Sequence, residues 1–275
     1  MARRRILVTG ATGFVGRQIC KALADKDVGL RCVVRNGREY QPSDLPDAEL
    51  VITRDLFAES TLWWVEQCKD VDTIIHAAWY TEPGKYLQSS KNIDCLAGSL
   101  SLARGAVQAG VKRFIGVGTC FEYDLSACFL SIGTPLKPTT SYACAKTALY
   151  YGLEHWLPSQ SVEFAWCRLF YLYGEGEDFR RLVPYVRSKL EQGEPAELTS
   201  GKQIRDFLNV AEAGRMIADV ALGEQTGPIN ICSGVPITVR QIAERIADEF
   251  GRRDLLMFGS RPDNLVDPPC VVGLP

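Results

Sequence analysis

The chain has 275 residues, of which 46% are hydrophobic and 23% are charged, and its formal net charge is −2. This length allows a large core in one domain, or a main domain with a smaller appendage. The basic residues are dispersed, which argues against a nucleic-acid partner because phosphate binding needs clustered cations. No apolar run is long enough to span a bilayer, so we expect no membrane partner either.

The first predicted element is a strand over residues 4–8, which runs into three glycines and a helix over 13–24. Gly10 permits a tight turn, Gly13 lets backbone approach a diphosphate, and Gly16 lets the helix pack on the strand. A diphosphate would lie at the helix N-terminus, where free N–H groups favour negative charge. The spacing is G-x-x-G-x-x-G, for which an ordinary turn is the alternative, but its place after an N-terminal strand favours dinucleotide binding. Further cofactor contacts would be Thr12, Phe14 and Val15.

Strand-like and helix-like segments alternate through the first two-thirds of the chain. Strands are expected at residues 4–8, 30–34, 50–52, 73–76, 113–117 and 163–169, and helices at 13–24, 62–67, 87–109 and 141–156. Short β-branched strands separated by helices predict a doubly wound parallel sheet of the Rossmann-like α/β class. We expect residues 1–172 to form this dinucleotide-binding domain.

The pattern loosens in residues 173–275. Helices are expected at 182–191, 210–222 and 238–249, and a strand at 229–232. Thr238 and Gln241 form a capping-box start for the last helix, and Gly251 is its stop signal. We expect a smaller C-terminal substrate-binding lobe over the carboxyl edge of the sheet, where ligands of such folds bind. Residues 203–232 should pack back against the main domain.

Ten cysteines are scattered along the chain without a C-x-x-C pair, and there are only two histidines. This spacing predicts no metal site. Most of the cysteines, such as Cys167 and Cys232, lie in apolar patterns where a reduced thiol behaves as a small hydrophobe. We therefore expect a reducing, cytoplasmic location.

Tyr142 and Lys146 are spaced by four residues and so share one face of a predicted helix. A lysine cation beside a phenol would lower the pKa of the phenol and suit it to proton exchange near neutral pH. An ordinary helix pair is the alternative. Two strand ends favour the catalytic interpretation: Thr119 supplies a hydroxyl at the carboxyl edge, and residues 76–78 supply small side chains where backbone would pass under a cofactor.

Together these residues resemble the extended short-chain dehydrogenase/reductase family, in its nucleotide-sugar epimerase/dehydratase branch. The resemblance covers nearly the whole chain and rests on residues 9–16, 55–56, 76–78, 205–207 and 229–234, with Asn92, Thr119, Tyr142 and Lys146. It implies that Tyr142 is the general acid/base and that Thr119 hydrogen-bonds the substrate oxygen. Lys146 would hold the nicotinamide ribose and tune Tyr142.

The resemblance also implies the remaining contacts of the site. Asp55 and Leu56 would line the adenine pocket, and Asn92 would be a structural or proton-relay group near the active site, with the structural role favoured. The other contacts with the cofactor would be Ala77, Ala78, Trp79 and Phe170. The other contacts with the substrate would be Cys120 and Tyr171.

Three cations are predicted to bind phosphate. Arg35 and Asn36 follow the second strand, where NAD-specific enzymes usually carry an acid, so Arg35 favours NADPH over NAD by pairing with a 2′-phosphate. Arg205 resembles the family arginine that grips the nucleotide diphosphate, and its planar fork matches phosphate oxygens. Arg261 would be a second cation across the cleft. The alternative for each is a surface arginine that is solvated or paired with a neighbour.

One departure from the family narrows the predicted reaction. Dehydratases of the family look like Thr-Asp-Glu where this chain has Thr119, Cys120 and Phe121, so dehydration is disfavoured. Glu122 is one place late for that role and is expected to be a solvated loop carboxylate. What remains is hydride transfer to or from a nucleotide-diphosphate sugar.

We therefore predict an NAD(P)-dependent 4-ketoreductase that makes a deoxysugar. The alternatives are a nucleotide-sugar 4-epimerase with tightly bound NAD and, more remotely, a non-catalytic NAD(P) sensor. Family members often form homodimers through helices like those at 87–109 and 141–156. Tyr150, Tyr151 and Trp156 would supply apolar area on such a face, with core packing as the alternative.

Overall fold

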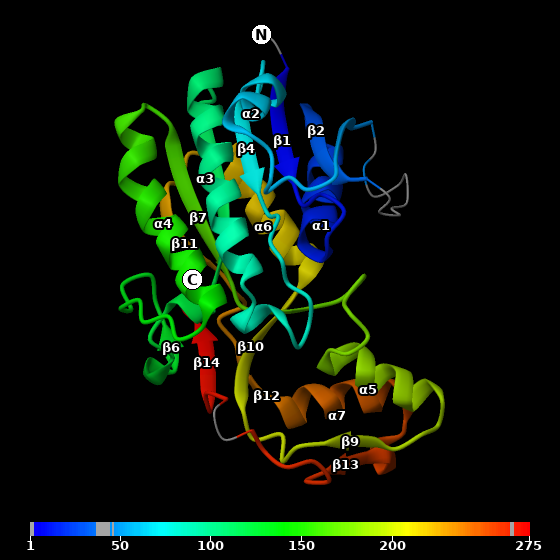
Figure 1. Ribbon diagram of the computed structural model, residues 1–275. Coiled ribbons are helices and arrows are strands. Elements are labelled where there is room, and N and C mark those ends of the chain that lie inside the picture. The colour runs from blue at the N-terminus through cyan, green and yellow to red at the C-terminus, as the bar shows by residue number, and fades with distance from the viewer. Residues whose placement is uncertain (1–2, 37–44, 46, 265–266) are drawn as a thin grey trace.

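A seven-stranded parallel sheet forms the centre of the computed structural model, which describes residues 3–36, 45, 47–264 and 267–275 (Figure 1). Its strand order is β11-β7-β5-β4-β1-β2-β3. The strands are β1 (Arg4–Thr9), β2 (Val28–Arg35), β3 (Glu49–Thr53), β4 (Thr73–His76), β5 (Arg113–Thr119), β7 (Glu163–Leu169) and β11 (Gly227–Ile231). The chain order reverses between β1 and β4, which is where folds of this kind open a ligand crevice. The predicted Rossmann-like parallel sheet is confirmed.

Helices cover both faces of this sheet. On one face α1 (Phe14–Ala24) packs with α6 (Val210–Leu222), and on the other lie α2 (Thr61–Gln67), α3 (Lys91–Ala109) and α4 (Ser141–Ser159). Alternate residues of β1 serve the two faces, because side chains alternate along a strand. Ile6 belongs to the core cluster of the first face and Leu7 to that of the second.

Two of the predicted helices have different bounds in the structure. The helix expected from residue 87 begins at Lys91, because a separate 3₁₀ turn, η2 (Tyr86–Gln88), precedes it. The helix expected to end at residue 156 continues through Pro158 to Ser159. In the part of the chain that the structure describes, no helix combines the length and apolarity needed to cross a membrane.

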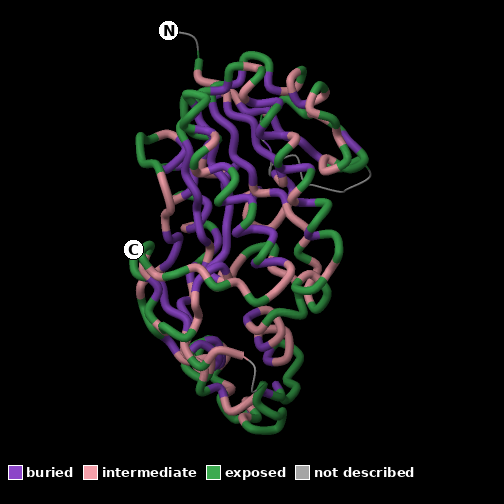
Figure 2. The backbone as a smooth tube through the Cα atoms, turned by 60° about the vertical axis from the view of Figure 1, so that its left-hand side comes forward, coloured by how far each residue is buried: buried purple, intermediate pink, exposed green. Residues whose placement is uncertain are grey.

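A smaller lobe lies beyond the carboxyl ends of the main strands, at the bottom of Figure 1. It contains α5 (Leu182–Glu191), α7 (Val239–Phe250), β9 (Ala196–Leu198) and β13 (Leu256–Phe258). Its helices share a separate hydrophobic core, so the buried backbone in Figure 2 forms a large group along the main sheet and a small group in the lobe. The predicted capping box of α7 is present, since Thr238 Oγ1 accepts from Gln241 N and the Gln241 side chain accepts from Thr238 N. Gly251 ends this helix in a left-handed conformation, with φ of +63°.

A second sheet joins the lobe to the main domain. Its strands are β6 (Phe129–Leu130), β8 (Tyr171–Tyr173), β10 (Ile204–Asn209), β12 (Pro236–Thr238) and β14 (Cys270–Gly273). Two other elements of the C-terminal third belong to the main domain. The strand β11 pairs with β7 in the main sheet, and α6, which directly follows β10, packs against α1.

One pair of cysteines departs from the expectation of reduced thiols. Cys128 and Cys270 form a disulfide across 142 residues of sequence, with their Cα atoms 4.8 Å apart. The parallel pairing of β14 with β6 brings the two residues together, because Phe129 follows Cys128 and pairs with Val272. The other eight cysteines are free thiols, and of these only Cys144 is exposed.

Candidate active site

The three glycines of the first turn form a cradle at the N-terminus of α1. Gly10 has φ of +73°, and a Cβ there would lie 2.7 Å from the Ala78 nitrogen. A Cβ at Gly16 would overlap the Gly10 carbonyl. Among the described atoms, a Cβ at Gly13 would meet only the Gly10 carbonyl oxygen, at 3.1 Å, and would otherwise fill open space above the helix N-terminus. This space and the free N–H groups around it fit a dinucleotide diphosphate.

A buried hydrogen-bond network supports the cradle from below. Thr9 Oγ1 lies 2.7 Å from His76 Nδ1, and His76 Nε2 lies 2.7 Å from Ser99 Oγ. Thr9 Oγ1 also accepts from Ala78 N at 3.4 Å, which holds the backbone of residues 77–78 beside Gly10. Burial lowers the pKa of His76 from 6.5 to about 3, so this imidazole is neutral and structural.

Tyr142 and Lys146 lie in the first two turns of α4, which the Thr140 hydroxyl caps by accepting from Ala143 N at 3.2 Å. Both are buried. Lys146 Nζ donates to the Val117 carbonyl oxygen at 2.5 Å and lies 3.9 Å from the centre of the Trp79 ring. Burial lowers the pKa of Lys146 to about 7.

The pKa of Tyr142 differs from the expectation. Burial raises it well above 10, and the neighbouring Tyr86 phenol raises it further. The rings of Tyr86 and Tyr142 pack edge to face with centroids 4.8 Å apart. The predicted net lowering of this pKa is wrong for this arrangement, because burial of the phenol is the largest influence on the pKa and raises it. Tyr142 is therefore held as a neutral phenol, the form that donates a proton.

Thr119 ends β5 next to Tyr142, and its side chain lies close enough to the Tyr142 hydroxyl to lower the pKa of Tyr142. Thr119 Oγ1 also accepts from Phe121 N at 3.3 Å, and Glu122 Oε1 accepts from Thr119 N at 2.8 Å. The structure thus brings together the three predicted catalytic residues, from the end of β5 and the start of α4.

The environment of Glu122 differs from the one that the sequence predicted. It was expected to be a solvated loop carboxylate, but it is fully buried and lies 2.7 Å from Arg168 Nε. Trp166 Nε1 also donates to it, at 3.0 Å to Oε2. Two sequence signals could have found it: the Thr119-x-x-Glu122 capping-box spacing, and an arginine in the middle of an apolar strand, which needs a buried acid.

Trp79 and Asn92 form a second polar contact at the site. Trp79 Nε1 donates to Asn92 Oδ1 at 2.9 Å, and Asn92 Nδ2 donates to the carbonyl oxygens of Tyr86 and Ser89 at 2.7 and 2.9 Å. These contacts give Asn92 a structural role, holding the 3₁₀ turn that carries Tyr86. Sequence reasoning missed Tyr86, although its ring contacts Tyr142.

The predicted adenine end of the site lies at the ends of β2 and β3. Arg35 and Asn36 are exposed, and Asn36 N donates to the Thr53 carbonyl oxygen at 2.8 Å. Asp55 is exposed and accepts from Phe57 N at 3.0 Å, while Leu56 packs on the core beside β2. The predicted contacts around α1 lie on the neighbouring strand-to-helix turn, where Thr12 is buried and Phe14 and Val15 are partly buried.

The predicted substrate residues occupy the junction between the sheet and the lobe. Cys120 and Phe170 are buried in one small apolar cluster, against which Tyr171 packs. Arg205 is also buried, 5.1 Å from the Tyr171 ring centre and 2.6 Å from Asp267 Oδ2. Arg261 lies elsewhere: it is exposed in the lobe, donates to Tyr185 Oη at 3.0 Å and lies 3.8 Å from Glu197. Arg261 is therefore a paired surface arginine, which was the alternative to phosphate binding.

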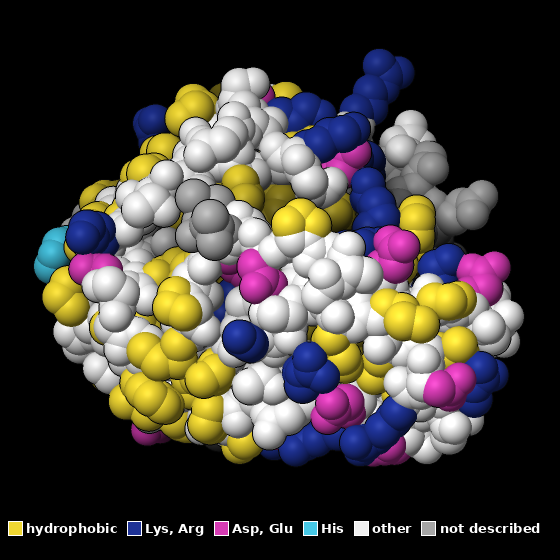
Figure 3. Space-filling view, turned by 90° about the horizontal axis from the view of Figure 1, so that it is seen from below, with side chains coloured by type: hydrophobic (Ala, Val, Ile, Leu, Met, Phe, Trp, Pro, Cys, Tyr) yellow, Lys and Arg dark blue, Asp and Glu magenta, His cyan; other side chains and the backbone are white. Residues whose placement is uncertain are grey.

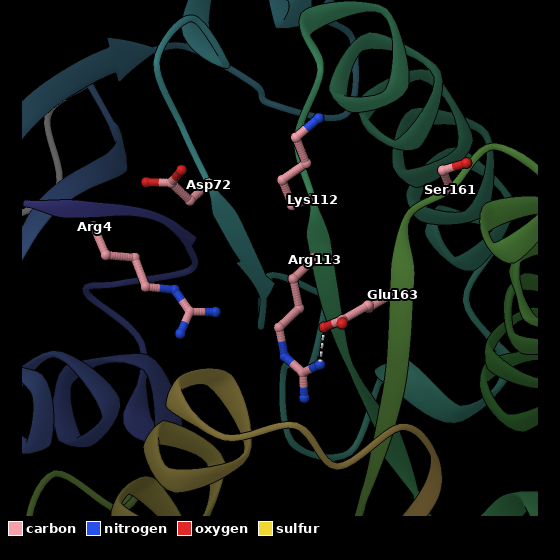
Figure 4. Close-up of a pocket in the computed structure, with 6 residues that line it drawn as sticks. All are labelled: Arg4, Asp72, Lys112, Arg113, Ser161 and Glu163. Carbon is pink, nitrogen blue, oxygen red and sulfur yellow. Dashed lines mark hydrogen bonds and ion pairs between the residues drawn. The ribbon is translucent and has the colours of Figure 1, made fainter. Parts of the chain in front are cut away.

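A hollow of about 500 Å³ opens at the opposite, amino-terminal edge of the sheet (Figure 4). Its lining residues are Arg4, Asp72, Lys112, Arg113, Ser161 and Glu163. Arg113 donates to Glu163 and to the Val220 carbonyl oxygen, and Arg4 donates to the Leu222 carbonyl oxygen at 3.1 Å. These arginines therefore attach the end of α6 to the sheet. Figure 3, which views the lobe end of the molecule, shows basic and acidic side chains interspersed.

The model of the NAD dependent epimerase/dehydratase family matches residues 6–232. The chain belongs to this family. It is 24% identical over 270 residues to a dTDP-6-deoxy-L-talose 4-dehydrogenase (NAD(+)) of Aggregatibacter actinomycetemcomitans, with 98% of each chain covered. It is 25% identical over 254 residues to a GDP-6-deoxy-D-talose 4-dehydrogenase of the same organism, covering 89% of this chain and 79% of the relative.

A solved structure of similar fold is the Thermus thermophilus UDP-glucose 4-epimerase in complex with NAD. Its TM-score is 0.83 at 19% identity, with 98% of this chain and 90% of that chain covered. The predicted family is thus confirmed, and the chain is an enzyme of a family whose members modify nucleotide sugars.

Proposed function

We propose that the protein is an NAD(P)-dependent 4-ketoreductase of a nucleotide-linked deoxysugar. The observation that carries the proposal is the contact of Thr119 with Tyr142 at the carboxyl edge of the sheet, in a site where Tyr142 is held as a neutral phenol. Two relatives that match most of the chain are 4-dehydrogenases of nucleotide-linked 6-deoxysugars, and dehydrogenation is the reverse of this reduction.

In the proposed reaction Tyr142 donates the proton that the sugar O4 needs when the carbonyl becomes an alcohol. Thr119 hydrogen-bonds the same oxygen and orients it toward the phenol. Lys146 binds the ribose beside the nicotinamide and places a positive charge near the developing alkoxide. The nicotinamide, when bound, supplies the hydride at C4.

Dehydration is disfavoured because neither of the two positions directly after Thr119 carries an acid. Cys120 and Phe121 occupy the positions of the family's acid pair, and burial raises the pKa of the Cys120 thiol. Glu122 is the nearest carboxylate in this described segment, and Thr119 N, Trp166 and Arg168 already occupy its oxygens.

We further propose NADPH as the preferred cofactor, although named relatives and solved neighbours carry NAD. Arg35 is the last residue of β2 and is exposed, so its guanidinium is free to reach a 2′-phosphate on the adenine ribose. No acid stands at that position to favour the 2′-hydroxyl.

For the substrate diphosphate we propose Arg205. It lies close enough to Cys120 and Tyr171 to lower the pKa of both groups, which puts its charge at the junction between sheet and lobe. The surface pairing of Arg261 with Tyr185 and Glu197 gives that residue no comparable position.

We also propose that the protein forms a homodimer through α3 and α4. Tyr150 is 5% exposed and Trp156 packs on the main core, so of the three predicted residues Tyr151, at 54%, offers exposed area. On α3, Ile93 and Leu100 are 62% and 38% exposed, which extends an apolar strip across the two helices. Light scattering at micromolar concentration should give twice the chain mass, and a monomer there would reject the dimer.

We keep the cytoplasm as the proposed location, because eight of the ten cysteines are free thiols. The disulfide of Cys128 with Cys270 is the observation against it, since such bonds persist mainly in oxidising compartments. Alkylation in intact cells followed by mass spectrometry decides: alkylated Cys128 supports the cytoplasm, and a protected pair contradicts it.

The proposed reaction is tested with purified protein and a dTDP-4-keto-6-deoxysugar. Protein that is purified without bound cofactor and consumes NADPH with this sugar supports the reductase. Protein that releases bound NAD on denaturation and interconverts 4-epimers without net NADPH consumption supports the epimerase instead.

A further inference from the structure

A buried ion pair lies directly behind the proposed catalytic residues. Glu122 and Arg168 are 0% and 1% exposed, and Glu122 Oε2 lies 2.7 Å from Arg168 Nε. Trp166 Nε1 donates to both oxygens of Glu122, at 3.1 and 3.0 Å. The carboxylate is therefore fixed by two side chains of β7, the strand next to β5.

Two glycines of β5 make the room for this arrangement. A Cβ at Gly116 would overlap the Trp166 ring, and a Cβ at Gly118 would overlap both the Trp166 indole and the Glu122 carboxylate. Burying two charges is costly unless they are paired and hydrogen-bonded, and apolar residues of similar volume would fill the same space at less cost. Packing alone therefore does not explain why the protein has a buried ion pair at this place.

The contacts of Glu122 lead to the reacting groups. Its Oε1 accepts from the backbone N–H of Thr119 at 2.8 Å, and the Thr119 side chain lies close enough to the Tyr142 hydroxyl to affect its pKa. We propose that Glu122, anchored by Arg168, is a positioning residue that holds Thr119 against Tyr142 and places a fixed negative charge behind Tyr142 and Lys146. The inference rests on the proposed function, because it assumes that these three residues do the chemistry.

The fixed charge has a measurable consequence. Glu122 raises the pKa of Lys146, which burial otherwise lowers, and it raises the pKa of Tyr142. The other groups that act on Lys146 and Tyr142 are Cys95 from α3, Tyr86 from η2, and Thr119 and Cys120 from β5 and the turn after it. The pKa values of these two thiols and of the Tyr86 phenol are raised, whereas Glu122 is a carboxylate ion-paired with Arg168.

The test compares Glu122→Gln with a matched control, Glu163→Gln. Glu163 forms an ion pair with Arg113 across the same two strands at their opposite end, 2.5 Å apart. In Glu122→Gln, kcat should fall by about ten- to a hundredfold, because a displacement near 1 Å has this effect on positioned groups. The alkaline limb of the kcat–pH profile should move to lower pH, since Lys146 and Tyr142 both lose a neighbouring anion. Glu163→Gln should keep the wild-type kcat and profile.

A second variant guards against misfolding caused by an unpaired Arg168. Glu122→Leu with Arg168→Met removes both charges at similar volume, which proteins often tolerate. It should unfold within a few degrees of wild type and bind NADPH normally, yet show the same loss of kcat. Wild-type kcat in either variant, or a loss in Glu122→Gln without the shift of the alkaline limb, overturns the inference. If Tyr142→Phe is itself fully active, the proposed function fails instead.

Discussion

The buried imidazole of His76 should make the stability of the protein depend on pH in a defined window. Its pKa is lowered from 6.5 to about 3 by burial between Thr9 and Ser99. The unfolded chain therefore binds a proton between pH 6.5 and pH 3 that the folded chain excludes, and stability falls as the pH falls through this window. From these values, acidification from pH 7 to pH 5 should reduce the free energy of unfolding by about 2 kcal/mol through this residue alone.

Urea unfolding followed by tryptophan fluorescence measures this effect, because the chain has five tryptophans. His76→Gln removes the titrating group, so its loss of stability between pH 7 and pH 5 should be smaller than that of wild type by about 2 kcal/mol. His155, the other histidine, is exposed on α4 and supplies the control variant His155→Gln, which should follow wild type. Parallel losses in wild type and His76→Gln would refute the reasoning.

Three further predictions concern binding and assembly. Arg35→Ala should raise the KM for NADPH by about ten- to a hundredfold, as expected for the loss of a charged hydrogen bond, and leave the KM for NADH unchanged. Equal effects on the two KM values would contradict the proposed pairing of Arg35 with the 2′-phosphate. Arg205→Ala should weaken nucleotide-sugar binding by about 2–5 kcal/mol in calorimetric titration while NADPH binding is retained. Arg261→Ala is its control, and equal losses in both variants would exclude a special role for Arg205. Tyr151→Glu should convert the dimer to a monomer in light scattering; an intact dimer would place the interface elsewhere.

Local patterns account for the parts of the structure that sequence predicted well. The turn of Gly10, Gly13 and Gly16 is dictated by close approaches within one strand–helix unit, so its spacing alone indicates it. The helix α7 begins and ends where Thr238 and Gly251 predict, because capping involves only neighbouring residues. Such features need no knowledge of the rest of the fold.

The features that sequence missed depend on distant segments. Cys128 and Cys270 meet only because β14 returns beside β6 across 142 residues. Glu122 is buried because Arg168 on the neighbouring strand needs a counter-ion, a demand that its own loop does not reveal. The position of the Lys146 ammonium group likewise depends on a distant residue. Its Nζ lies 3.9 Å from the centre of the Trp79 ring, and Trp79 follows β4.

The central claim is that Tyr142 is the proton donor of a hydride transfer to the sugar C4. Its most direct test is a reaction with NADPH deuterated at C4 of the nicotinamide and a dTDP-4-keto-6-deoxysugar, with deuterium at the sugar C4 measured by mass spectrometry. Wild type should transfer the label at a rate about two to four orders of magnitude above Tyr142→Phe, the range typical of general acid catalysis, with equal NADPH affinity in both. Equal rates of label transfer in the two proteins would contradict the account.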